Sequence, residues 1–185
     1  SAASDVYKRQ GSFRTPFNPR YSSHMKSDYT EGNAFQWSFF APHDMDNFIS
    51  TIGGKKELET RLDTLFTTSS QVDGEEASGD ITGLIGQYAH GNEPSHHMAY
   101  LYNWTDSPWK GQERLDQIMQ NFYTNAPDGI IGNEDCGQMS AWYVMSALGF
   151  YQIAPGIPVY TLGRPMIDKA LILSLIHISE PTRRS

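Results

Sequence analysis

The sequence has very little cysteine and is short of basic side chains. Cys136 is the only cysteine, so no disulfide can form within the chain, and the compartment is left undecided. The 14 Lys and Arg residues are outnumbered by 21 Asp and Glu residues, which gives a net charge of −7. Nucleic acid is therefore not expected as the main partner, because phosphate binding needs clustered basic groups. A run of about 18 apolar residues is also missing, so no membrane-spanning helix is predicted.

What the chain does contain is enough apolar material for a folded domain. Its hydrophobic content of 38% and aromatic content of 12% exclude a disordered composition. Both ends look foreign to this domain, because residues 1–10 and 172–185 resemble translated adaptor sequences from short-read gene assembly. The alternative is a natural flexible start and a short amphipathic tail. We expect residues 11–171 to be the natural part and an internal piece of a longer protein.

The body of the chain is predicted to be mainly α-helical. Apolar residues recur at helical spacing in several segments, and Gly53 with Gly54, Pro108 and Gly149 stand where helices are expected to end or begin. The last of these segments is apolar nearly all round, which predicts a deeply buried helix. After it, Pro and β-type residues over 151–167 predict short strands or an extended segment. Helices are expected over 43–52, 55–67, 95–104, 108–123 and 138–150.

The dipeptide Gly-Asn occurs three times, each time just before an apolar or helical run. Glu31 precedes the first pair, Glu93 follows the second, and Glu134 and Asp135 follow the third. Gly and Asn tolerate left-handed backbone conformations, so a tight turn is expected at each pair. Each acid on its own is explained equally well as a helix cap, which contributes about 0.3–1 kcal/mol. The pairs are Gly32-Asn33, Gly91-Asn92 and Gly132-Asn133.

The recurrence of this pattern favours a site over three separate caps. The runs that follow the three pairs are rich in aromatic and histidine side chains, so helix starts that meet would place carboxylates in an aromatic-lined cleft. Such a cleft suits a sugar, whose hydroxyls bond to acids while its C–H faces stack on rings. Glycoside hydrolysis needs two carboxyl groups that flank the scissile bond. The aromatic and histidine residues are Phe35, Trp37, His96, His97, Tyr100, Trp142 and Tyr143.

Metal and cysteine chemistry are weaker alternatives. Glu93 and His96 have the spacing found in di-iron bundles, but those need two copies and the chain has one. A hard cation held by oxygens fits these loops better, because carboxylates, Asn amides and backbone carbonyls are plentiful in them. Cys136 has no evident base and lies among acids, which do not favour a thiolate nucleophile, so a small half-buried residue is the simpler interpretation.

Three stretches resemble the bacterial exo-acting α-mannosidases of glycoside hydrolase family 92. They read DYTEGNAFQWSFFAPHDMDNFI, GNEPSHHMAYLYN and DGIIGNEDCGQMSAWYVMSALGFYQIAPG. The resemblance covers residues 11–170 and implies that the segment is part of an (α/α)6 barrel, preceded in the intact protein by a β-sandwich domain that is absent here. It further implies calcium-dependent, inverting removal of terminal α-linked mannose from N-glycans or mannans, and a periplasmic, cell-surface or secreted location.

The resemblance also implies roles for individual residues. Glu31 falls on the general acid and Asp135 on the general base. Asn133 departs from an Asp found in some members, so an auxiliary carboxylate is lost there. Substrate contacts are expected from Trp37, Asn92, Glu93, His96 and Glu134, with Asn92 and Glu93 also expected to bind Ca²⁺ and His90 nearby.

Two other functions stay open at the level of the sequence. A non-catalytic carbohydrate-binding helical module would keep the aromatic residues and Glu93 but would not need both Glu31 and Asp135 in one pocket. An unrelated α/α-barrel hydrolase that acts on glucosides would share the use of two acids but not these motifs. The mannoside linkage is not predicted, and the segment alone is expected to fold or act poorly.

Overall fold

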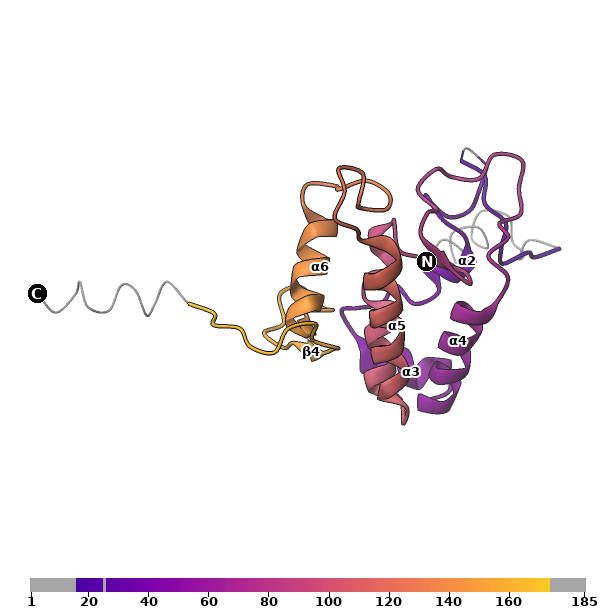
Figure 1. Ribbon diagram of the computed structural model, residues 1–185. Coiled ribbons are helices and arrows are strands. Elements are labelled where there is room, and N and C mark those ends of the chain that lie inside the picture. Colours follow the sequence, from indigo (N-terminus) through magenta and orange to yellow (C-terminus); the bar gives the residue numbers. More distant parts are fainter. Residues whose placement is uncertain (1–15, 25, 174–185) are drawn as a thin grey trace, which may run out of the picture.

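The computed structural model describes residues 16–24 and 26–173. The described chain is mainly helical, with a few two-residue strands, which confirms the predicted class (Figure 1). The expected adaptor segments lie outside the described residues except for 172 and 173, which are exposed. The helices are α2 (Ala34–Trp37), α3 (Met45–Ile52), α4 (Lys55–Thr67), α5 (Pro108–Phe122) and α6 (Gln138–Leu148), with 3₁₀ helices η1 (Glu93–Ser95) and η2 (Met98–Trp104).

The predicted helix ends are confirmed by local chemistry. Asp44 caps α3 by accepting a hydrogen bond from the backbone N–H of Asn47, and Gly53 ends it at φ 112°. Pro108 occupies the first turn of α5, where its missing N–H costs nothing. Gly149 ends α6 with a left-handed φ of 94°.

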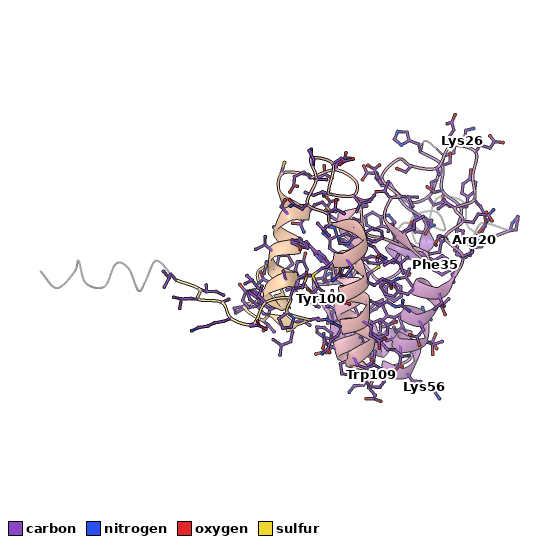
Figure 2. The ribbon with its side chains drawn as sticks, in the orientation of Figure 1. Arg20, Lys26, Phe35, Lys56, Tyr100 and Trp109 are labelled. Atoms are coloured by element: carbon purple, nitrogen blue, oxygen red, sulfur yellow. The ribbon has the colours of Figure 1, made fainter. Side chains whose placement is uncertain are left out.

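The core is centred on η2 and not on one of the long helices. The five residues from Met98 to Tyr102 are all fully buried, because α4, α5 and the strand β4 (Thr161–Leu162) pack against different sides of this segment. The expected helix over 95–104 is present only as the 3₁₀ helix over 98–104, and its apolar side chains do not share one face. A tighter 3₁₀ helix turns its side chains in three directions, and here each direction meets a neighbour. In Figure 2, Tyr100 lies between α6 and α5, whereas Trp109 and Lys56 lie at the outer end of the helices.

Helix α6 is not the deeply buried helix that its composition predicts. Met139, Trp142 and Ser146 face the core, but Val144 on another side is 56% exposed. Its main neighbours are the strand β3 (Phe150–Tyr151) and α5, and the side that carries Val144 stays exposed. Figure 1 shows α6 at the edge of the helical layer, with α5 between it and α4.

Two short hairpins complete the fold. Near the C-terminal end β3 pairs antiparallel with β4, as the expected short strands required. The second hairpin joins β1 (Leu84–Ile85) to β2 (Tyr88–Ala89) and was not expected, because two-residue strands leave no alternation to detect. Its turn packs on the end of α4, where Gln87 N–H donates to the Leu65 carbonyl at 2.7 Å.

Candidate active site

The first Gly-Asn loop holds its acid in an unusual backbone conformation. Glu31 has φ 52°, in the left-handed region that side chains other than Gly and Asn rarely adopt. The carbonyl before it, on Thr30, accepts a hydrogen bond from Trp37 Nε1 at 2.8 Å, and its own carbonyl accepts one from Asn92 Nδ2 at 2.9 Å. The expected turn is present, but the left-handed residue is Glu31 and not Asn33 two residues on, which is extended at φ −130°.

Asn33 instead anchors the loop to the start of α2. Its side chain accepts from the N–H groups of Phe35 and Gln36, while Gln36 Oε1 accepts from the Asn33 N–H at 2.7 Å. Asn33 Nδ2 also donates to Gln87 Oε1, and Gln36 Nε2 to the Gln87 carbonyl. These buried amides fix the loop against the β1–β2 hairpin. Nothing in the sequence marks Gln36 and Gln87 as part of the site, since a buried amide network leaves no motif.

The second and third loops touch through their glycines. A methyl group on Gly132 would lie 2.8 Å from the Gly91 carbonyl oxygen and 2.9 Å from Gly91 Cα. Gly91 is equally confined, because a methyl group there would overlap Thr82 Oγ1. A residue without a side chain is therefore required at Gly132 by the Gly91 backbone and at Gly91 by Thr82.

The two acids of the third loop have different surroundings. Glu134 accepts hydrogen bonds from the Ser140 N–H at 3.0 Å and from Ser140 Oγ at 2.8 Å, so its side chain caps the start of α6. Asp135, at φ 45°, shares the left-handed conformation of Glu31. Among the described residues, Cys136 is the third non-glycine residue with positive φ, and it is exposed. The cap interpretation therefore holds for Glu134, whose role in sugar binding stays a prediction.

Glu93 is the point at which the three acids meet. Burial raises the pKa of its carboxyl, and the nearby carboxylates of Asp135 and Glu31 add to that rise. Glu93 Oε1 is also buried without a hydrogen-bond partner among the described residues. The structure thus brings together Glu31, Glu93 and Asp135, one from each loop.

His90 and His96 are core residues. The Tyr88 hydroxyl donates to His90 Nδ1, and His90 Nε2–H donates to the Tyr123 hydroxyl, which donates onward to the Met139 carbonyl. Burial lowers the pKa of His90 to about 2 and that of His96 to about 4. His96 is engaged on both ring nitrogens, since Nε2–H donates to the His90 carbonyl and Nδ1 accepts from Gln138. Its expected contact with substrate stays a prediction.

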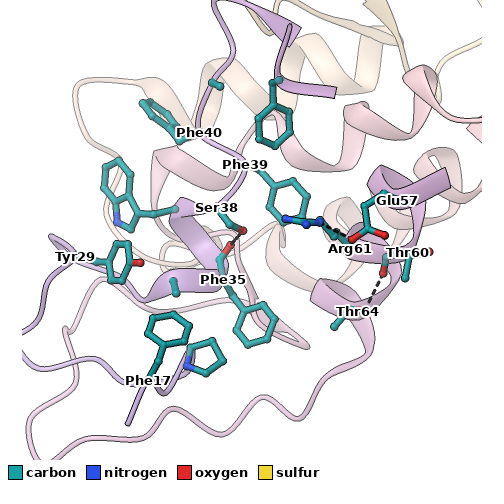
Figure 3. Close-up of a pocket in the computed structure, with 15 residues that line it drawn as sticks. Phe17, Tyr29, Phe35, Ser38, Phe39, Phe40, Glu57, Thr60, Arg61 and Thr64 are labelled. Carbon is teal, nitrogen blue, oxygen red and sulfur yellow. Dashed lines mark hydrogen bonds and ion pairs between the residues drawn. The ribbon is translucent and has the colours of Figure 1, made fainter. Parts of the chain in front are cut away.

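Two hollows lie near this constellation. One, of about 290 Å³, is lined by Glu93, His96, Phe40 and Tyr151. The other, of about 660 Å³, lies between α2 and α4 and has none of the three acids in its lining. In Figure 3, Tyr29 and Phe40 lie on one side of the view and the Glu57–Arg61 pair of α4 on the other, with Phe35 between them. Phe40 belongs to both hollows, and Trp37, which packs edge-on against Phe40, lines the larger one.

The described residues contain no group of three or more His, Cys, Asp or Glu side chains arranged to hold a metal ion. Asn92 and Glu93, the expected calcium ligands, are adjacent at the second loop. The Asn92 amide nitrogen donates to the Glu31 carbonyl, which leaves the Asn92 side-chain oxygen available.

Residues 16–24 and 26–173 include no helix with the length and apolar character that crossing a bilayer requires.

Carboxyl groups from three loops come together on this helical scaffold, and one of them, that of Glu93, lines a hollow with aromatic side chains, which is the kind of arrangement that glycoside hydrolases use. The family model described as the glycosyl hydrolase family 92 catalytic domain matches residues 6–179. The chain belongs to this family.

Solved relatives share both sequence and structure with the chain. The family GH92 α-mannosidase BT3965 of Bacteroides thetaiotaomicron, solved in complex with mannoimidazole, is 45% identical and covers 84% of this chain with a TM-score of 0.76. The family GH92 inverting mannosidase BT2199 of the same organism is 34% identical over 84% of this chain, with a TM-score of 0.64. An uncharacterized secreted glycosidase of Arthroderma benhamiae is 27% identical over 142 residues, or 77% of this chain.

The chain spans only a small part of each relative. It covers 21% of BT3965, 22% of BT2199 and 16% of the Arthroderma protein. The described residues therefore correspond to a fragment of the family 92 domain.

Proposed function

We propose that the enzyme containing this segment removes terminal α-linked mannose from N-glycans or mannans by calcium-assisted, inverting hydrolysis. Membership of family 92 and the mannosidase activities named for BT3965 and BT2199 support the reaction. The observation that carries the proposal is the meeting of Glu31, Glu93 and Asp135 on three loops. A carbohydrate-binding module has no need to join Glu31 to Asp135, and family membership argues against an unrelated glucosidase.

In this proposal Glu31 is the general acid and Asp135 the general base. An inverting enzyme needs one carboxyl to protonate the leaving oxygen and another to activate a water on the opposite face of the sugar. Both side chains are exposed, as groups that meet substrate and water must be. Glu93, a half-buried residue whose Oε1 is buried, contacts the terminal sugar, and Trp37, Asn92, His96 and Glu134 complete the expected surroundings.

Calcium fits one feature of the site. Hard cations bind oxygen ligands, and Glu93 Oε1 is a buried carboxylate oxygen with no partner among the described residues. Asn92 could add its side-chain oxygen, whereas further ligands would come from carbonyls, water or substrate. When bound, the cation would hold two sugar hydroxyls and favour a distorted ring.

The rest of the enzyme is inferred from the same resemblance. We place the helices of this segment in an (α/α)6 barrel that residues outside the described part complete, with a β-sandwich domain ahead of it. A periplasmic, cell-surface or secreted location agrees with the name of the Arthroderma relative.

The test compares Glu31→Gln and wild-type full-length enzyme on two α-mannosides, one with an alkyl leaving group and one with a 2,4-dinitrophenyl group. The variant should lose alkyl-mannoside hydrolysis by at least about 100-fold and keep most activity on the activated substrate, which needs no acid. A calcium chelator should abolish wild-type activity, and NMR should detect β-mannose as the first product. Alkyl-mannoside activity that survives in Glu31→Gln would refute the assignment of the acid.

A further inference from the structure

The conformation of Glu31 has to be held by its neighbours. A left-handed backbone costs a residue with a side chain roughly 1–2 kcal/mol, so it persists only where the surroundings impose it. Glu31 lies in a short loop with an exposed side chain, and its own carboxyl makes no hydrogen bond recorded among the described residues. The restraint must come through the backbone.

Two side chains supply that restraint, one on each carbonyl that flanks the Glu31 Cα. Trp37 Nε1 donates to the Thr30 carbonyl at 2.8 Å, and Asn92 Nδ2 donates to the Glu31 carbonyl at 2.9 Å. The donors come from different parts of the chain, α2 and the second Gly-Asn loop. Trp37 also packs over Gly32, where a methyl group would lie 2.9 Å from its indole nitrogen. The peptide planes on both sides of Glu31 are therefore pinned.

We infer that Trp37 and Asn92 are positioning residues that aim the Glu31 carboxyl at the leaving oxygen. The inference rests on the proposed role of Glu31 as the general acid. Rotation of either peptide plane would swing the carboxyl away, and a misplacement of about 1 Å at a reacting group costs about 100-fold in rate. Asn92 adjoins Glu93, and Gly91 before it touches Gly132 of the base loop, so the same hydrogen bond sets the acid in register with the other two carboxyls.

A positioning role for Trp37 can be distinguished by measurement from a role in stacking against the sugar ring. A tryptophan that only stacks on sugar acts through its ring face, and Phe would replace much of it. A tryptophan that positions the acid acts through its N–H, which Phe lacks. The discriminating variant is therefore Trp37→Phe, with Asn92→Asp as its counterpart, because Asp keeps the shape of Asn but cannot donate.

The experiment measures kcat and KM of both variants in the full-length enzyme, on the alkyl and the 2,4-dinitrophenyl α-mannoside. We expect the ratio of kcat for the alkyl substrate to kcat for the activated substrate to fall at least about tenfold in each variant, whatever the change in KM. Trp109→Phe and Asn103→Asp are the matched controls. Trp109 is an exposed indole on α5, and Asn103 donates to two carbonyls elsewhere in the fold.

Each outcome has one meaning. Equal losses on both substrates, or a change confined to KM, would overturn the positioning role, as would a calcium requirement altered in Trp37→Phe. Circular dichroism and melting temperature identify a variant that is merely unfolded, and in that case a crystal structure of the other variant decides by the φ of residue 31. If Glu31→Gln fails to discriminate between the leaving groups, the proposed function fails; if it discriminates and Trp37→Phe does not, only the positioning role fails.

Discussion

At the scale of single residues, Glu134 and Asp135 are neighbours with separate tasks. Glu134 ties its carboxylate to Ser140 in the first turn of α6, whereas Asp135 turns away in a left-handed conformation towards Glu93. One acid supports the helix, and the other is available for chemistry.

This division predicts opposite results for the two substitutions. Glu134→Ala should lower the free energy of unfolding by about 1 kcal/mol, the usual cost of losing a cap. Asp135→Asn should leave stability unchanged or raise it, because it removes a negative charge beside Glu93 and Glu31, and it should abolish hydrolysis. Denaturant unfolding and mannosidase assays on both variants check this, and a more stable Glu134→Ala would contradict it.

The acidic residues of the site could be predicted from the sequence, but the buried amides that fix their loops could not. Glu31, Glu93 and Asp135 stand beside Gly-Asn pairs, and the repetition of that pattern is visible in the sequence. The amides of Gln36 and Gln87 carry no such signal, since their importance depends on which carbonyl or amide the fold places opposite them. The left-handed conformation of the acids was likewise assigned to Gly and Asn, because propensity favours those residues and tertiary contacts override it.

At the scale of elements, the second and third loops approach each other at Gly91 and Gly132. Gly132 and Gly137 flank the third loop, and both have positive φ, at 73° and 91°. A methyl group on Gly132 meets the Gly91 backbone, whereas one on Gly137 meets nothing within 4 Å.

Alanine substitution at Gly132 and at Gly137 therefore separates the cost of the left-handed backbone from the cost of a clash with the Gly91 backbone. Gly137→Ala should cost only the left-handed conformation, roughly 1–2 kcal/mol. Gly132→Ala should cost more than that and lower kcat as well, since the third loop, which carries the proposed base, must move away from Gly91. The comparison needs melting curves and kcat for both variants. Equal changes in melting temperature and kcat for the two variants would mean that the contact between the loops contributes to neither stability nor rate.

Elements were predicted best where one face alone packs on the core. The stripe Leu58, Leu62 and Leu65 predicted α4 with the bounds observed, because only that face is buried. Prediction failed where that condition failed. Residues 98–102 are covered on every side and form a 3₁₀ helix, while α6 is apolar all round yet covered on one side only.

At the scale of the whole molecule, buried neutral histidines couple stability to pH. Burial lowers the pKa of His97, whose Nε2–H donates to the Phe39 carbonyl at 2.9 Å, and the pKa values of His90 and His96 are lowered as well. Because the folded-state pKa lies below the unfolded value of about 6.5, the unfolded state binds more protons below that pH. Stability is therefore full above about pH 6.5 and falls as the pH decreases.

His97→Gln isolates one of these contributions, because Gln can donate to the same carbonyl but does not titrate. Between pH 7.5 and pH 5 the melting temperature of the wild type should fall further than that of the variant. Calorimetry at the two pH values measures the difference. A gap between wild type and variant that is the same at both pH values would exclude His97 as a source of the acid sensitivity.

The hydrogen bond from Asn92 to Glu31 joins residues 61 apart in the chain, and the glycine contact ties that junction to a third distant loop. Proteins open locally at far lower free energies than they unfold, and surface loops open most readily. Opening any one of these loops separates the carboxyls even while η2 and its neighbours stay packed. The fraction of catalytically active molecules is then set by the loop that opens most readily. Activity should therefore be lost on heating at temperatures where the core is still folded.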